Sequence, residues 1–203
     1  MDPFMSNLQT NKIISYLSEN DIMLEYGSGG STSIFSKYVK HYYSVEHDSE
    51  WYNKVHEDIL NNKNITHILC KPNYTGDDKG SLHARENLSN DNVERIKLLY
   101  PYSEENNDYS CIGRFSQFEN YVNSIDSFNV EKFDKVLVDG RSRTICCYKI
   151  LPYLTNESII FIDDFYRLSY SGRTRGIVEF GEQFFDVYEK VEQVDKMLVA
   201  RKK

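Results

Sequence analysis

Hydrophobic and polar positions along the chain follow two periods, one typical of buried strands and one of amphipathic helices. Short, nearly continuous apolar runs predict strands, and apolar residues three or four positions apart predict helices between them. The expected strands are 22–26, 42–46, 65–70, 133–138, 158–162, 186–191 and 196–200; the expected helices are 8–19, 32–38, one capped by Asp48 or Ser49, 115–125, 142–154 and 173–182. Repeated strand–helix units predict an α/β fold with a doubly wound, mostly parallel sheet and helices on both faces. A short turn joins the last two strands, so they are expected to pair antiparallel.

A glycine-rich loop follows the first strand, in the segment Glu25-Tyr26-Gly27-Ser28-Gly29-Gly30-Ser31-Thr32. Glycine adopts positive φ and lets the backbone come into contact with a ligand. The helix that starts after the loop presents unpaired N–H groups. Together these features predict a cradle for a nucleotide-sized ligand. The alternative is a tight strand–helix turn that binds nothing.

The second strand ends on an acid, Glu46, which supports the binding interpretation. An acid about 20 residues past a glycine loop is where a ribose diol is held in nucleotide-binding α/β folds. The loop lacks the Gly-x-Gly-x-x-Gly spacing of dinucleotide sites, which disfavours a nicotinamide cofactor. Instead, Glu25 lies two positions before Gly27 and can reach a ligand ammonium directly or through water.

These segments resemble the class I S-adenosylmethionine (SAM) methyltransferases. Leu24–Thr32 looks like their first motif and Ser44–Asp48 like their second, and the likeness continues in Phe133–Arg143 and Ile159–Phe165. It covers most of the chain except about 72–112. The resemblance implies SAM as cofactor and a seven-stranded sheet whose last strand is inserted antiparallel beside the fifth. The expected cofactor-binding residues are Glu25, Gly27, Ser28, Gly29, Gly30, Ser31, Thr32, Glu46, His47, Phe115 and Asp139.

Three aspartates form the candidate catalytic group: Asp139 ends one predicted strand, and Asp163 and Asp164 end its neighbour. Three carboxylates at one sheet edge raise one another's pKa unless a cation neutralises them, and Mg²⁺ or another hard divalent ion suits such oxygen ligands. The arrangement resembles the metal-dependent catechol and caffeoyl O-methyltransferases. The chain departs from that pattern, with Asp164 in place of an asparagine and Gly140-Arg141-Ser142-Arg143 in place of a lysine-containing motif. The alternative is metal-free, with Asp139 facing the cofactor and Asp163 or Asp164 acting as a general base.

Four residues near these aspartates are candidates for binding the acceptor: Arg141, Arg143, Tyr166 and Arg173. Guanidinium groups bind carboxylates and phosphates through a bidentate fork. For the arginines next to Asp139, ion pairing with the aspartates is at least as good an interpretation. The preferred acceptor is a hydroxyl of a small polar molecule, such as a sugar, a glycan precursor or a nucleotide-sugar.

The length of 203 residues predicts one domain, 1–203. Residues 1–4 resemble a vector remnant. The segment 72–112 is an insertion that we expect to act as a lid over the acceptor. A net charge of −7 argues against a nucleic-acid partner. The sequence shows no apolar run of transmembrane length and no signal peptide. The four cysteines have no Cys-x-x-Cys spacing, so reduced thiols and a cytoplasmic location, including a host cytoplasm for a viral protein, are expected. The oligomeric state stays open.

Other functions remain open at this point. One is a SAM-binding partner subunit without activity, although the acids at Glu46, Asp139, Asp163 and Asp164 argue against loss of activity. Another is a Rossmann-like enzyme of different chemistry, such as a nicotinamide oxidoreductase or an aminopropyl transferase. Nucleic-acid methylation is disfavoured by the acidic charge and by the absence of an Asn/Asp-Pro-Pro-Tyr/Phe motif.

Overall fold

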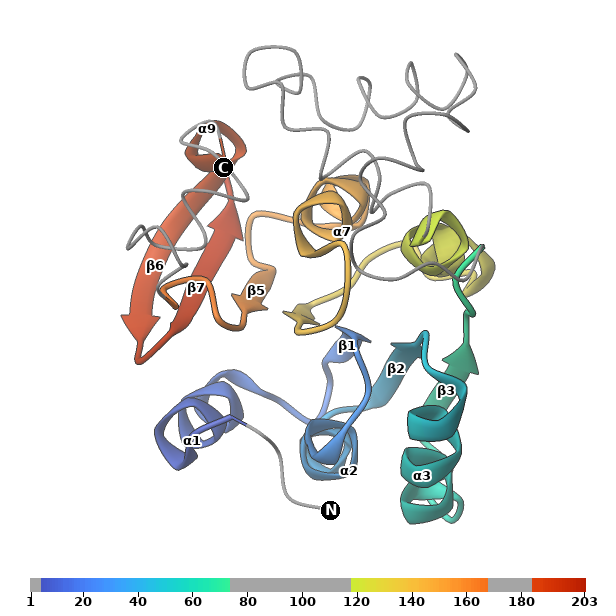
Figure 1. Ribbon diagram of the computed structural model, residues 1–203. Helices are drawn as coiled ribbons and strands as arrows, with labels where there is room; N and C mark the ends of the chain where they lie inside the picture. Colours follow the sequence, from blue (N-terminus) through green and yellow to red (C-terminus); the bar gives the residue numbers. More distant parts are fainter. Residues whose placement is uncertain (1–4, 74–117, 168–183) are drawn as a thin grey trace, which may run out of the picture.

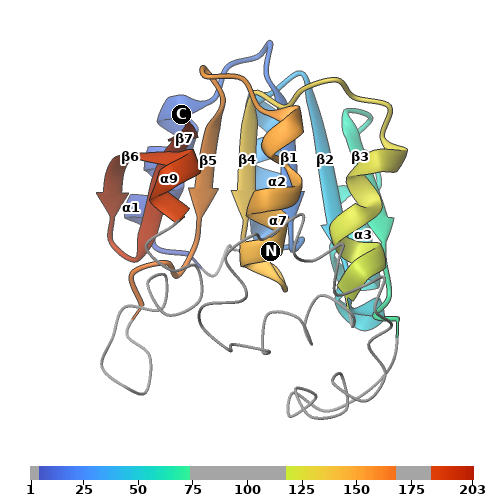
Figure 2. The same ribbon diagram turned by 90° about the horizontal axis from the view of Figure 1, so that it is seen from above.

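The computed structural model of the chain describes residues 5–73, 118–167 and 184–203. Its strands form one seven-stranded sheet in the order β3-β2-β1-β4-β5-β7-β6, seen face-on in Figure 2. The first five strands run parallel, and β7 pairs antiparallel with both β5 and β6. The strands are β1 (Ile22–Tyr26), β2 (His41–Glu46), β3 (Ile65–Leu69), β4 (Lys135–Val138), β5 (Ile159–Ile162), β6 (Tyr188–Val194) and β7 (Met197–Lys202).

Helices cover both faces of the sheet, as Figure 1 shows. One face carries α1 (Asn7–Tyr16), α2 (Gly30–Phe35) and α3 (Ser49–Ile59). The other carries the helical residues 118–123 continued by η2 (Ser124–Ser127), then α7 (Arg143–Lys149) and α9 (Phe184–Val187). Two further 3-10 turns are η1 (Ser36–Tyr38) and η3 (Leu151–Tyr153). In the described part of the chain, no helix combines the length and the hydropathy needed to cross a membrane.

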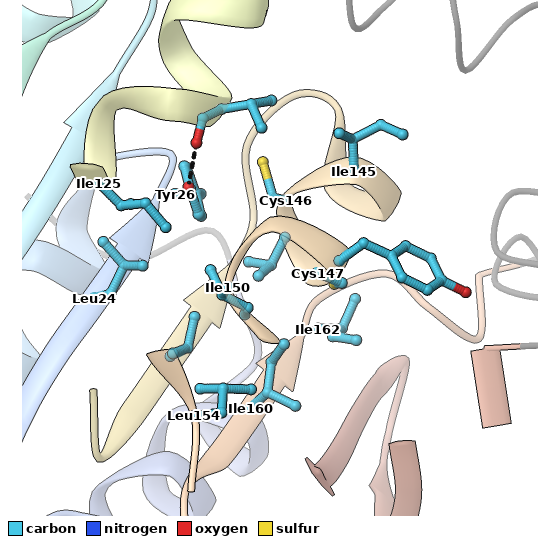
Figure 3. Close-up of a cluster of buried hydrophobic side chains, with 14 of the residues drawn as sticks. Leu24, Tyr26, Ile125, Ile145, Cys146, Cys147, Ile150, Leu154, Ile160 and Ile162 are labelled. Atoms are coloured by element: carbon cyan, nitrogen blue, oxygen red, sulfur yellow. Dashed lines mark hydrogen bonds between the residues drawn. The ribbon is translucent and has the colours of Figure 1, made fainter. Parts of the chain in front are cut away.

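Two hydrophobic clusters, one on each face, hold the helices to the sheet. Leu24 and Tyr26 of β1 belong to the cluster beneath α7, drawn in Figure 3, where the Tyr26 hydroxyl donates to the carbonyl oxygen of Val122 at 2.7 Å. Met23, on the same strand, belongs to the opposite cluster with Ile13 of α1. Successive side chains of a strand point to opposite faces, so burial on both faces explains the nearly continuous apolar runs in the sequence.

The predicted seven-stranded, mostly parallel sheet and the antiparallel insertion of its last strand beside β5 are confirmed, while several element boundaries differ. The strand expected from 186 begins at Tyr188, because 184–187 forms α9. The helix expected over 142–154 ends at Lys149 and resumes as η3, which contains Pro152. Proline lacks the amide that a continuing helix needs. The N-cap predicted for α3 is Asp48, whose carboxylate accepts from the amide of Trp51 at 2.8 Å.

Candidate active site at the carboxyl edge of the sheet

The loop between β1 and α2 turns at Gly27 and touches the loop that follows β4. Gly27 has a φ of 98°, and its amide donates to the carbonyl oxygen of Val45 at 2.9 Å. A Cβ on Gly27 would lie 2.7 Å from both Cα and the amide nitrogen of Gly140. The close approach that the sequence predicted for a ligand is therefore made, at Gly27, to the protein's own backbone.

Gly29 lies on the same loop, but the described residues leave room for a side chain there. It is the N-cap of α2, and its amide donates to the Thr32 hydroxyl at 3.0 Å. Among the described residues, the one atom within 4 Å of an added Cβ is Oγ of Ser31, at 3.7 Å. Room beside a glycine at the carboxyl edge of a parallel sheet is what a bound molecule needs to approach the backbone.

Glu25 lies under this loop and is 0% exposed. Its carboxylate accepts hydrogen bonds from the hydroxyls of Ser31 at 2.5 Å, Thr32 at 2.6 Å and Ser44 at 2.7 Å. Burial raises the pKa of Glu25 to about 7, and these hydroxyl donors oppose that rise. Glu25 thus joins β1, β2 and the start of α2, and the sequence-based prediction that it contacts a ligand ammonium stays a prediction.

Glu46 ends β2 beside the same loop and is 2% exposed. Its Oε2 accepts from the amide of Ser28 at 3.0 Å and from the Ser28 hydroxyl at 3.1 Å. Its Oε1 accepts from the amides of His47 at 2.8 Å and Asp48 at 2.9 Å. Burial favours a higher pKa, but the hydrogen bonds and charge of His47 and the amide of Asp48 outweigh it and hold the pKa of Glu46 below its ordinary value.

Trp51 connects α3 to the glycine loop, because its indole Nε1 donates to the carbonyl oxygen of Ser28 at 2.7 Å. His47 lies nearby, with Nδ1 2.7 Å from Oε1 of Glu46 and its ring edge-on to Phe118 at 5.4 Å between centroids. These contacts place both His47 and Trp51 beside the predicted cradle.

A second group of polar side chains lies at the ends of β4 and β5. Arg143, at the start of α7, is 11% exposed and donates to Oδ1 of Asp139 at 3.0 Å and to the carbonyl oxygens of Asp163 and Gly140. Its Nη1 is 3.9 Å from Oδ2 of Asp163. Burial raises the pKa of Asp139, the Arg143 charge opposes the rise, and the neighbouring Asp163 carboxyl adds to it. Of the two interpretations offered for Arg143, ion pairing with the aspartates matches its contacts.

Gln9 of α1 reaches Asp163 from the opposite face of the sheet. Its Nε2 donates to Oδ1 of Asp163 at 2.9 Å, while its Oε1 accepts from the amide of Ser6 in the capping box of α1. Asp163 is therefore held between α1 and α7. Gln9 was not predicted as a site residue, because its position three residues after Ser6 indicates only a capping box.

The three aspartates do not converge as the metal-site hypothesis requires. Asp164 has a φ of 56°, and its Oδ2 pairs with Arg167 at 3.1 Å. Within the described residues there is no group of three or more His, Cys, Asp or Glu side chains that could hold a metal ion. Asp139 and Asp163 also share Arg143, a cation that already offsets their charge. The donor set does not fit the predicted Mg²⁺ site, because the three carboxylates form no such group and Arg143 already lies against two of them.

The other residues predicted for the acceptor and cofactor sites have different surroundings in the described part of the chain or fall outside it. Arg141 is exposed on the loop after β4. Tyr166 lies against the β6–β7 hairpin, where its amide donates to the carbonyl oxygen of Lys196 at 2.8 Å and Lys190 Nζ lies 4.9 Å from its ring centroid. Phe115, Arg173 and nearly all of the segment 72–112 fall outside the described residues.

The fold is shared with solved structures of methyltransferases. A methyltransferase-like protein from Silicibacter pomeroyi is 19% identical, with a TM-score of 0.66 and coverage of 100% of this chain and 88% of that one. An O-methyltransferase from Bacillus cereus, crystallised with SAH, is 12% identical, with a TM-score of 0.60 over 96% of this chain and 79% of that one. An rRNA methylase from Streptococcus thermophilus is 12% identical, with a TM-score of 0.54 over 98% and 99%.

The sequence itself matches no protein-family model and no curated protein. The likeness therefore concerns the arrangement of the chain in space, which includes the seven-stranded sheet and the antiparallel β7. The chain has the class I SAM-dependent methyltransferase fold.

Proposed function

We propose that this chain is a SAM-dependent methyltransferase that transfers a methyl group to a hydroxyl of a small polar acceptor. The observation that carries the proposal is the contact of Gly27 with Gly140, which joins the glycine loop to the loop that holds Asp139. An acid that can take a proton thus lies beside the predicted cofactor cradle. Both loops are at the carboxyl edge of parallel strands, where ligands of open α/β sheets bind.

The residues around the glycine loop fit SAM. The open side of Gly29 leaves room for the ligand against the backbone. Glu46, ionised because its pKa is lowered, suits the two hydroxyls of a ribose. The B. cereus O-methyltransferase of the same fold was crystallised with SAH, the demethylated product of SAM. These points support SAM over a dinucleotide, whose pyrophosphate the glycine spacing does not suit.

The acidic pair Asp139 and Asp163 supports an O-methylation. Bound SAM supplies a methyl group on a sulfonium centre, and its C–S bond breaks as the bond from the acceptor oxygen to that carbon forms. The hydroxyl proton must then pass to a base. Asp139 suits this task because burial raises its pKa, which makes its carboxylate a stronger base. Arg143 keeps the pair oriented through its contacts with both aspartates.

A sugar or glycan-precursor hydroxyl remains the preferred acceptor. It is supported by the polar carboxyl edge and by exposed Arg141, a residue that can bind an anionic group of a nucleotide-sugar. The rRNA methylase of S. thermophilus shares the fold and makes RNA the second candidate. The net charge of −7 disfavours RNA, because phosphate contacts need a basic surface.

The proposal can be tested with SAM labelled in its methyl group. The wild-type protein is incubated with labelled SAM and one candidate acceptor at a time, from a panel of sugars, nucleotide-sugars, catechols and RNA. We expect label in a sugar-type acceptor at an oxygen, and loss of transfer in Asp139→Asn. Transfer to RNA alone would overturn the acceptor class, and failure to bind SAM or SAH in calorimetry would overturn the function.

A further inference from the structure

Ser28 places both of its hydrogen-bond donors on the carboxylate proposed to hold the ribose. Its amide and hydroxyl donate to Oε2 of Glu46 at 3.0 and 3.1 Å. The amides of His47 and Asp48 donate to Oε1 at 2.8 and 2.9 Å. An ionised carboxylate has about four acceptor positions. With Nδ1 of His47 a further 2.7 Å from the same Oε1, these donors saturate Glu46 before any ligand is present.

A ribose would bring two more donors to the same carboxylate, so two of the present donors must leave. The amides of His47 and Asp48 are fixed, because Asp48 is the N-cap of α3 and accepts from the amide of Trp51 at 2.8 Å. The Ser28 hydroxyl, in contrast, leaves by rotation about one bond. Of the two donors on Oε2, it is the one that moves at less cost.

Trp51 ties the position of this loop to α3, since its Nε1 donates to the carbonyl oxygen of Ser28 at 2.7 Å. The Ser28 amide is the second donor that gives way to the ribose, and the backbone shift this requires changes the Trp51 hydrogen bond as well. Trp51 is the only tryptophan in the 203 residues, so its emission reports on this one loop.

We propose that Ser28 is an affinity-determining residue of the cofactor site, whose hydroxyl occupies a ribose-hydroxyl position on Glu46 and must be displaced when the cofactor binds. The inference rests on the proposed function, because it takes Glu46 as the ribose acceptor. From the sequence, Ser28 was expected to help bind the cofactor, whereas here its hydroxyl lowers the affinity for the cofactor. A residue that competes with the ligand lowers affinity, whereas a residue that contacts it raises affinity.

The test compares Ser28→Ala with the wild-type protein by calorimetric titration with SAH. The variant loses the competing hydroxyl but keeps the amide, and we expect SAH to bind about threefold to tenfold tighter, the net effect of one ordinary hydrogen bond. Ser33→Ala is the matched control: it removes a hydroxyl from α2 that donates to the carbonyl oxygen of Gly30 at 3.0 Å. Its SAH affinity should equal that of the wild type. Ser28→Cys, with a weaker donor, provides a second variant if Ser28→Ala does not fold.

Trp51 emission supplies an independent measurement during the same titrations. We expect SAH to change the emission of the wild-type protein, because the bond from Nε1 to Ser28 is disturbed. Unchanged or weaker SAH binding by both Ser28 variants overturns the inference and leaves the proposed function standing. A wild-type protein that binds neither SAH nor SAM overturns both.

Discussion

Gly27 and Gly140 lie against each other so closely that neither position has room for a side chain. A Cβ on Gly27 would lie 2.7 Å from the backbone of Gly140, and a Cβ on Gly140 would lie 3.0 Å from the amide nitrogen of Gly27. The hydroxyl of Tyr121 would be 2.0 Å from the Cβ on Gly140. This contact fixes the distance between the glycine loop and the loop of Asp139, and it makes the two loops one unit.

Gly27→Ala should destabilise the fold. The new Cβ meets rigid backbone, and the φ of 98° is unfavourable for any residue with a side chain. Such strain costs about 1–3 kcal/mol, and the clash adds to it. Urea unfolding of the free protein measures the loss. Gly29→Ala is the control, since its Cβ finds open space, and equal losses in the two variants would contradict the loop–loop contact.

The fold was predictable because burial on both faces leaves a direct mark on the sequence. Runs such as Ile159–Ile162 are apolar at every position, and polar or glycine-containing segments separate such runs from the helices. The positions of the glycine loop and of Glu46 at the carboxyl edge of the sheet were predictable for the same reason, because they lie at the ends of strands that the pattern locates. Boundaries near Tyr188 were missed, because a single helical turn has too few residues to show a period.

The contacts of the acidic group were not predictable. Gln9 and Asp163 are 154 positions apart, and nothing in the local sequence of α1 distinguishes a glutamine that caps a helix from one that also binds a distant carboxylate. Arg143 had two equally good interpretations, and only the geometry of α7 selects pairing with Asp139. Asp164 has a positive φ, which aspartate adopts more readily than most residues, but residue type alone does not predict this conformation or the pair with Arg167.

Gly29→Val should abolish cofactor binding while leaving the fold intact. Its branched side chain fills the open space beside the loop, and the extended backbone at this position, with φ of −179°, accepts valine without strain. Calorimetry with SAH measures the affinity, and thermal unfolding without ligand measures the fold. Normal SAH binding by a folded variant would show that Gly29 is only a turn residue.

Asp139→Asn and Asp163→Asn should each lower turnover by a factor of about 10²–10⁴, the usual effect of losing a general base or the group that supports it. Asp164→Asn should change turnover by less than about threefold, because its carboxylate pairs with exposed Arg167. Initial rates with the acceptor identified in the labelled-SAM panel measure all three variants. A large loss of turnover in Asp164→Asn alone would identify Asp164 as the general base.

Chelation should leave methyl transfer unchanged. The three aspartates do not form a ligand set, and Arg143 balances the charge of Asp139 and Asp163. Activity is compared after dialysis against EDTA, with and without added Mg²⁺ or Mn²⁺. A loss of activity that added Mg²⁺ restores would contradict this expectation and show that methyl transfer depends on a metal ion.

Glu25 should make the protein less stable as the pH rises from about 4.5 to about 7. Burial raises the pKa of this carboxyl from 4.5 to about 7 in the folded state, so the folded protein holds a proton that the unfolded chain has already released. The free energy of unfolding then falls with rising pH across this window. The stability that protonated Glu25 contributes is fully present below the pKa of this group in the unfolded chain, and it is lost above its pKa in the folded protein. Its size is on the order of 3 kcal/mol, at 1.36 kcal/mol per pKa unit.

Glu25→Gln isolates this contribution, because glutamine has the same shape and does not titrate. Its amide can still accept from the hydroxyls of Ser31, Thr32 or Ser44, which now surround Glu25. Urea unfolding at pH values from 4 to about 8 gives the free energy of unfolding of both proteins. We expect the wild-type curve to fall relative to the variant curve between pH 4.5 and about 7. Parallel curves would show that Glu25 is ionised throughout, held by its three hydroxyl donors against the cost of burial.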